Sequence, residues 1–167
     1  MKNVFPLAVV ALVAAISSVI VARLSIPVWT MFIGWISFVA GGMSSKTALR
    51  SYVCDLLGVA LGFIGALLIS GGAGALGGDF ALLLGVFVIV FAALLAQHLP
   101  FANLVVCYFI GMTTFFASGL APVASTGLLL AAGLFAGVAS GLIAVTLSGF
   151  LTRGRAARDA DAAATRS

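Results

Sequence analysis

Charge is almost missing from this chain. Of its 167 residues only 7% are charged, whereas 63% are hydrophobic. Within residues 4–152 the formal charges are Arg23, Lys46, Arg50, Asp55 and Asp79. A water-soluble domain of this length carries a charged surface, so this composition excludes one. We therefore predict an integral membrane protein whose main partner is the lipid bilayer.

The residue types that perform catalysis are scarce too. The chain has one His, two Cys and four acidic residues. No nucleophile stands at a usable spacing from a base, and no cluster has metal-ligand spacing. Residues 71–78 are glycine-rich but lack the Gly-Lys-Ser/Thr of a phosphate loop, so we expect a flexible connection there. The sequence predicts neither an enzyme nor a cofactor or metal site.

Six apolar segments account for most of the chain. Most of them are near the roughly 20 residues that a helix needs to cross a bilayer. Their continuous Ala, Leu and Gly content favours helices over barrel strands, which alternate in polarity. We expect an all-α, polytopic fold with spans at residues 4–22, 27–42, 52–70, 80–97, 101–120 and 125–152. Together they form one transmembrane domain, residues 1–152.

The basic residues predict the orientation, because they collect in the cytoplasmic loops of membrane proteins. With both termini in the cytoplasm, only Arg23 falls outside. The cytoplasmic set is then Lys2, Lys46, Arg50, Arg153, Arg155, Arg158 and Arg166. The tail, residues 153–167, has no large apolar residue, so we expect disorder or a short surface helix there. The net charge of +4 follows from this asymmetry and does not indicate nucleic-acid binding.

The two halves of the chain resemble each other. The second and fifth spans share one spacing pattern, carried by Gly34, Phe38 and Gly42 and by Gly111, Phe115 and Gly119. The third and sixth spans are both lined by glycines, at Gly58, Gly62 and Gly65 and at Gly133, Gly137 and Gly141. We predict repeat units at residues 1–78 and 79–152, with three helices each. An odd number of helices inserts the second unit upside down, about a pseudo-two-fold axis in the membrane plane, as in many transporters.

The second and fifth spans combine short length, glycine, aromatic rings and hydroxyl groups. Short or glycine-broken spans at matching positions of two halves point to a binding site, and we expect Gly34 to interrupt the second span. The residues predicted to line a narrow pore for a small polar solute are Trp29, Gly34, Trp35, Ser37, Phe38, Tyr108, Gly111, Thr113, Thr114 and Phe115. The alternatives are interfacial anchoring for Trp29 and close helix packing for the glycines.

Asp55 is the acidic residue inside a predicted span. Gly58, Gly62 and Gly65 share its helical face, and a glycine face packs against protein rather than lipid. A carboxylate is costly to place in a membrane, so it is a functional candidate by default. The candidate roles are proton coupling, cation binding, or an ion pair with Arg50 or Lys46.

Residues 27–35, followed by Gly41 and Gly42 in a chain of six spans, resemble a family of small bacterial inner-membrane proteins known only as a domain of unknown function. The resemblance covers about residues 1–150. It implies the bacterial inner membrane as the location and assigns no catalytic residue. From the residues themselves we expect a self-associating channel or permease with its site between the second and fifth spans. The alternative is a non-transporting subunit or assembly partner of a larger complex.

Overall fold

The computed structural model describes residues 4–164, and within them every regular element is helical. In chain order the elements are α1 (Val4–Arg23), α2 (Val28–Ala40), α3 (Ser45–Leu76), α4 (Gly78–Leu95), the 3-10 turn η1 (Ala96–His98), α5 (Val105–Ser118) and α6 (Ala124–Ala164). Helices α1, α3, α4 and α6 are long and apolar enough to cross a membrane, whereas α2 and α5 are shorter apolar helices. Helix length and hydropathy thus confirm the prediction of an all-α, multi-pass membrane protein.

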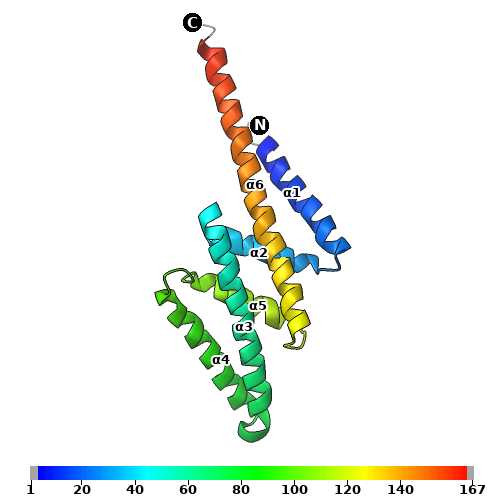
Figure 1. The fold of residues 1–167 in the computed structure, drawn as a ribbon, viewed down its shortest axis with the longest axis vertical. Coiled ribbons are helices and arrows are strands. Elements are labelled where there is room, and N and C mark those ends of the chain that lie inside the picture. Colours follow the sequence, from blue (N-terminus) through cyan, green and yellow to red (C-terminus); the bar gives the residue numbers. More distant parts are fainter. Residues whose placement is uncertain (1–3, 165–167) are drawn as a thin grey trace.

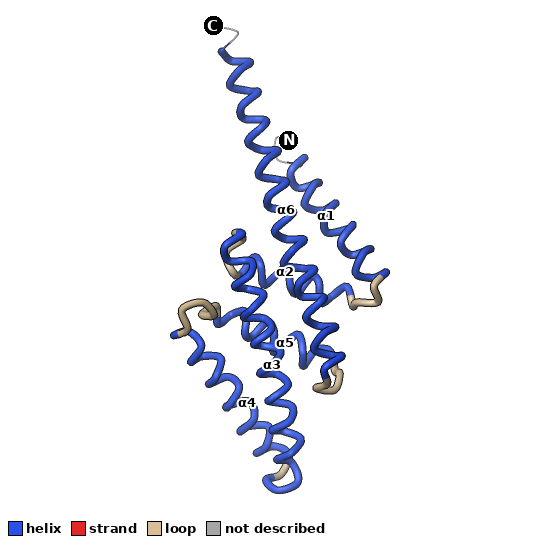
Figure 2. Tube along the Cα trace, viewed as in Figure 1, coloured by secondary structure: helices blue, strands red, loops and turns tan. Residues whose placement is uncertain are grey.

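The long helices pair at two ends of the molecule, and the short helices lie between these pairs. Figure 1 shows α1 beside α6 at the end that holds both termini, and α4 beside α3 at the other end. The short helix α2 packs along α6, and the short helix α5 packs along α3. Helices α3 and α6 also contact each other near the centre, and Figure 2 shows how short the connections are.

A tight turn and a capping box begin α3. Gly42 (φ 104°) and Met43 (φ 52°) adopt left-handed backbone conformations and reverse the chain after α2. The Ser44 hydroxyl then accepts a hydrogen bond from the Thr47 backbone N–H at 3.2 Å, and the Thr47 hydroxyl accepts one from Ser44 N–H at 3.3 Å. These bonds satisfy amide groups that the first helical turn leaves open. The helix therefore begins at Ser45, before the predicted residue 52, and it carries Lys46.

The flexible connection predicted at residues 71–78 is wrong. Helix α3 continues through Leu76 and ends only at Gly77, whose φ of 81° suits glycine. Glycine is a poor helix former, but these glycines continue an existing helix and need no new nucleation. Gly72 also lies against Ala81 of α4, where a Cβ would come within 3.3 Å of the alanine Cβ. The small residues therefore allow a close helical hairpin between α3 and α4.

The centre of the molecule is filled by apolar side chains. Val59 of α3, Phe115 of α5, and Leu130 and Leu134 of α6 form one buried cluster where the four inner helices meet. Both leucines are fully buried. Ile33 of α2 packs against the same cluster. The seam between the two halves of the chain is therefore closed by side chains over this region.

Helix α6 continues through Ala164. Composition favoured disorder or a short surface helix for residues 153–167, and the backbone as far as residue 164 instead prolongs the last membrane helix. Continuing an existing helix needs no new nucleation, so even a polar Ala-Arg-Asp sequence can follow it. Of the predicted cytoplasmic residues, Lys2 and Arg166 lie outside the described part of the chain.

Candidate functional site

The contact between α2 and α6 is made backbone to backbone. Gly34 lies so close to the backbone of Leu134 that any Cβ at position 34 would overlap the Leu134 carbonyl. Gly137 makes the reciprocal contact with Met31 and Gly34. Helix α2 is continuous through this point, so the predicted interruption at Gly34 is wrong. The glycine is needed for close helix packing, which small residues permit in membrane proteins.

The contact between α5 and α3 repeats the same geometry. Gly111 lies against the backbone of Asp55, and Gly58 lies against the backbone of Tyr108. Gly111 stands 77 residues after Gly34, and Gly137 stands 79 residues after Gly58. The two helix pairs therefore touch at corresponding positions.

Two phenylalanine contacts follow the same correspondence. Phe38 of α2 packs on Gly141 of α6, where a Cβ would stand 2.7 Å from the ring, and Phe115 of α5 packs on Gly62 of α3 at 2.8 Å. Both rings are buried. The contacts thus match Gly62 with Gly141. The order of the glycines in the sequence pairs Gly62 with Gly137 instead, which lies one helical turn earlier in α6.

A buried polar pair joins α2 to α3. The Ser37 hydroxyl, in the last turn of α2, donates a hydrogen bond of 2.7 Å to Asp55 Oδ1 of α3, and both side chains are fully buried. Among the described residues, Asp55 Oδ2 has no hydrogen-bond partner. The hydroxyl of Ser51, one turn before Asp55 on the same helical face, is likewise buried and has no partner in the described part of the chain. Buried polar groups are normally satisfied, so two such atoms in one cluster require a reason.

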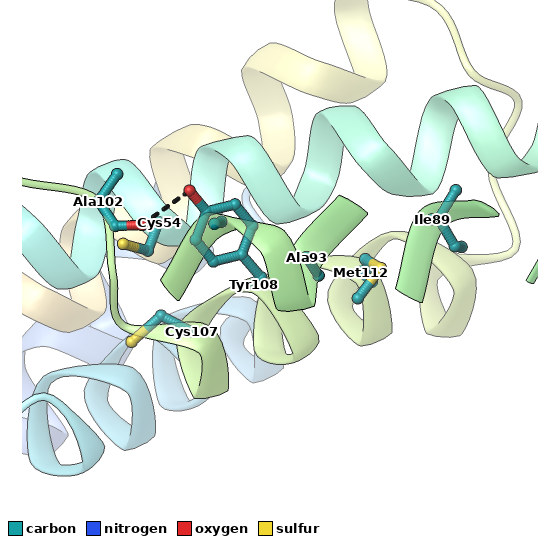
Figure 3. Close-up of a cluster of buried hydrophobic side chains, with 8 residues drawn as sticks. Cys54, Ile89, Ala93, Ala102, Cys107, Tyr108 and Met112 are labelled. Atoms are coloured by element: carbon teal, nitrogen blue, oxygen red, sulfur yellow. Dashed lines mark hydrogen bonds between the residues drawn. The ribbon is translucent and has the colours of Figure 1, made fainter. Parts of the chain in front are cut away.

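Two cysteines complete the surroundings of this pair. Cys54 of α3 and Cys107 of α5 are fully buried free thiols, and Cys107 lies beside Ser37, Ser51 and Asp55. Figure 3 shows both thiols within the apolar cluster in which the Tyr108 hydroxyl donates a 3.0 Å hydrogen bond to the Ala102 carbonyl. Among the described residues no three His, Cys, Asp or Glu side chains gather as metal ligands. The side chains of Ser37, Ser51, Asp55 and Cys107 therefore form a small polar cluster within an apolar interior.

The corresponding place in the other half carries no acid. By the same offsets, Leu134 stands where Asp55 stands and Leu130 stands where Ser51 stands. Thr114 takes the position of Ser37, but its hydroxyl bonds the Ile110 carbonyl of its own helix at 2.8 Å. The backbone geometry is thus shared, and the acid belongs to one half only.

The structure does not bring Arg50 or Lys46 to Asp55. The Arg50 guanidinium donates a 2.8 Å hydrogen bond to the Phe101 carbonyl and a second hydrogen bond to the Asn103 side chain, both in the connection between η1 and α5. The Lys46 side chain is exposed. Arg50 therefore fastens a loop, and Asp55 has Ser37 as its polar partner in place of a cation.

The residues predicted to line a pore divide into two groups. One group is buried between helices: Gly34, Ser37, Phe38, Tyr108, Gly111, Thr114 and Phe115. Of these, Ser37 joins Asp55, while the glycines and phenylalanines form the packing contacts described above. Trp29, 39% exposed, and Thr113 face outward, and Trp35 is half-buried.

An apolar groove of about 400 Å³ lies between α3, α4 and the start of α5. Its walls include Leu57 and Leu61 of α3, Ala92 and Leu95 of α4, and Tyr108 of α5. Lining of this kind suits lipid chains or other apolar groups. The polar cluster around Asp55 does not line this groove.

Sequence reasoning missed Ser51, Cys107 and the loop contact of Arg50. Ser51 could have been found, because it precedes Asp55 by four residues and so shares its helical face. The contact of Cys107 with this face depends on tertiary packing and has no local signal.

Comparison with known proteins adds a family but no precedent for a mechanism. Neither the curated proteins nor the solved structures contain a match to this chain. One family model covers residues 8–148, which include the glycine contacts and the buried polar cluster. The chain belongs to the family described as a protein of unknown function, DUF1097.

Proposed function

We propose that this chain is a permease for a small polar solute, built from two three-helix units of opposite orientation. The observation that carries the proposal is the Asp55 carboxyl, which is fully buried and bonded to Ser37 across the contact of α2 and α3, and whose second oxygen has no hydrogen-bond partner within residues 4–164. A carboxyl group inside a membrane protein is costly and is normally retained for function. No enzyme activity is proposed.

Matching contacts support the division into residues 1–78 and 79–152. The pairs α2 with α6 and α5 with α3 touch at corresponding glycines, and α1 beside α6 matches α4 beside α3 (Figure 1). Each helix of the first unit thus contacts the second unit as its counterpart contacts the first, which is what a two-fold relation produces. With three helices in each unit, the axis lies in the membrane plane.

The proposed solute site lies between α2 and α5, against the face of α3 that carries Asp55. Polar groups are few there, which favours a small neutral or singly charged solute over a large charged metabolite. The buried Phe115, Leu130 and Leu134 close the seam in the described conformation. Transport therefore requires α2 or α5 to shift relative to α3, so that Asp55 becomes accessible.

A flux assay in proteoliposomes tests this function. Glycerol, urea, ammonium and acetate serve as probes, because they are small and either neutral or singly charged. We expect flux of at least one probe above the protein-free rate. The flux should fall in Asp55→Asn, which removes the charge at nearly constant size, and in Gly34→Leu, which disturbs the contact of α2 with α6.

Asp79→Asn is the matched control, because Asp79 is an exposed acid in the first turn of α4. It should transport like the wild type. Protein that folds but transports none of the probes would contradict the proposal. An equal loss of flux in Asp55→Asn and Asp79→Asn would show that Asp55 has no specific role in transport.

We propose that the protein lies in the bacterial inner membrane and that both of its termini face the cytoplasm. The native Cys54 and Cys107 are fully buried, so a cysteine introduced at an exposed position becomes the reactive one. Ser25→Cys, after α1, should react with a membrane-impermeant maleimide added to whole cells. Ser45→Cys, at the start of α3, should react only after lysis. The reverse pattern would overturn the orientation.

A non-transporting membrane subunit is the second candidate. The filled apolar seam favours it, because a helix scaffold that only binds a partner needs no passage. Such a protein should co-purify with a larger complex at fixed stoichiometry and show no flux alone. Flux from the purified chain by itself would exclude this role as its only function.

We also propose self-association. Only 6% of the α1 span is buried within the chain, so nearly the whole surface of this helix is available to lipid or to another copy. Light scattering of the detergent-solubilised protein should give a mass of two or more chains. A monomer would contradict the proposal.

A further inference from the structure

The free oxygen of Asp55 raises the question of how its charge is compensated. A carboxylate in a water-excluded interior needs a cation or several hydrogen-bond donors, because the loss of hydration costs several kcal/mol or more. Asp55 Oδ1 has one donor, Ser37, and Oδ2 has none among the described residues. One hydrogen bond does not replace the hydration shell of an ionised carboxylate.

Among the side chains that the structure describes, none brings a positive charge to Asp55. The titratable groups near enough to interact with a charge on Asp55 are Tyr52 and Cys54 from α3 and Cys107 from α5. All three are neutral or negative when they titrate. The nearest basic residue along α3, Arg50, is bonded to the connection between η1 and α5. The partner Ser37 is in the last turn of α2, where the helix dipole is negative and disfavours a further negative charge.

A proton fits this place better than a metal ion does. A metal ion needs several oxygen ligands arranged around it, with room for the ion itself. The cluster offers Asp55 Oδ2 and the hydroxyls of Ser37 and Ser51, all from fully buried residues, with the thiol of Cys107 beside them. A proton needs one oxygen and no extra volume.

We propose that Asp55 is the proton-carrying group of this protein, neutral in the closed conformation, and that it couples solute movement to the movement of one proton. This inference deepens the proposed permease function and rests on it. Protonation forms an O–H bond on Asp55 and takes one proton from water on one side of the membrane. When the cluster opens to the other side, that bond breaks and the proton returns to water there.

The second half of the chain predicts the stoichiometry. The positions that correspond to Asp55 and Ser51 are occupied by Leu134 and Leu130, which cannot titrate. Each chain should therefore carry one proton in each cycle. The contact of α5 with α3, which holds Asp55, should respond to pH, and the contact of α2 with α6, which holds Leu134, should not.

Infrared spectroscopy of the full-length protein in nanodiscs tests the protonation state directly. The chain has only four acidic side chains, so the carboxyl region is simple. At pH 7 we expect the C=O band of a protonated carboxylic acid in the wild type and in Asp79→Asn, and its loss in Asp55→Asn. Addition of Na⁺ at constant pH should leave the band unchanged. No protonated band at pH 7, or a band that disappears when Na⁺ is added, would overturn the proposal.

Proton coupling is tested separately in proteoliposomes that contain a pH-sensitive dye. A gradient of the transported solute should move protons faster than in protein-free liposomes, where ammonia and acetic acid cross unaided, in the wild type and in Asp79→Asn, but only at the protein-free rate in Asp55→Asn. Solute flux without proton movement would overturn the coupling. A protonated Asp55 in a protein without any flux would instead overturn the permease function, so the two failures are distinguishable.

Discussion

Two helix contacts of this molecule, α2 with α6 and α5 with α3, form two seams between its halves. These two seams have the same backbone geometry and differ in the side chains that they bury. Where α2 meets α6, Gly34 touches Leu134, and where α5 meets α3, Gly111 touches Asp55. The helix approach is the same, because the glycines at both places allow backbone contact. One seam, however, buries a leucine and the other buries an acid. Close packing is therefore a property of the repeated fold, and the acid is an addition to one half.

The largest effect is expected from exchanging the chemistry of the seams. Leu134→Asp places an acid in an apolar cluster, and a charge at this depth costs about 3 kcal/mol. Asp55→Leu removes an incompletely satisfied carboxyl and installs the residue that the matching position already accepts, but it also leaves the buried Ser37 hydroxyl without its acceptor, so it should cost about 1–2 kcal/mol, less than Leu134→Asp. Thermal unfolding in detergent, followed by circular dichroism, measures both. Strong destabilisation by Asp55→Leu would mean that the acid has a structural role.

The glycine contacts allow a second test of the comparison. Gly34→Val and Gly111→Val should each destabilise the protein by about 2–3 kcal/mol, because the facing backbone cannot move aside as a side chain could. The two losses should agree to within about 0.5 kcal/mol if the seams are equivalent in packing. Gly74→Val, where nothing lies within 4 Å, is the control and should cost far less. Unequal losses at positions 34 and 111 would break the equivalence.

Much of the fold could be predicted from composition because a membrane imposes simple rules. Continuous apolar segments located the six helices, and the scarcity of charge excluded a soluble domain. The ends were less accurate, since α3 runs from Ser45 to Leu76 and passes through a glycine-rich stretch that usually marks a loop in water. Local propensity gave the wrong result there because the stretch prolongs an existing helix and Gly72 packs against Ala81 of α4.

A smaller effect should distinguish the two hydroxyls at matching positions. Ser37→Ala removes the hydrogen bond to Asp55 Oδ1 and should cost about 1–2 kcal/mol, because the carboxyl loses its only partner among the described residues. Thr114→Val removes a bond within α5 and should cost at most about 1 kcal/mol. Unfolding in increasing SDS measures both. Equal losses of stability in Ser37→Ala and Thr114→Val would show that the hydrogen bond between α2 and α3 contributes no more than a bond within one helix.

The site was only partly predictable, and the reason lies in which contacts are local. Asp55 was recognisable as an acid on a glycine face, and Ser37 was included among the polar residues of the second span. Their bond was not foreseen, because it depends on how α2 crosses α3. The cations close to Asp55 in sequence suggested an ion pair, but Arg50 reaches Asn103 instead. Sequence proximity was a poor guide to partners where helices pack at fixed angles.

The smallest effect is expected at Arg50, which has no counterpart in the second half because Leu129 stands at the matching position. Arg50→Ala should cost about 1 kcal/mol, since the contact is partly open to solvent and its loss is softened by water. Hydrogen exchange should rise in the connection between η1 and α5 and stay unchanged around Ser25. Uniform change in both regions would show that Arg50 supports the whole fold.

The lengths of α2 and α5 have a consequence for the surrounding lipid. With 13 and 14 residues they extend only about 20 Å, whereas the hydrocarbon layer is about 30 Å thick. Lipid beside these helices must thin, or polar headgroups and water must sink toward them, and either adjustment costs a fraction of a kcal/mol per ångström of mismatch. Both bring the aqueous phase nearer to the Asp55 cluster than in a protein of six full-length spans. Bilayers made of shorter acyl chains should therefore suit this protein better than thick, sterol-stiffened ones.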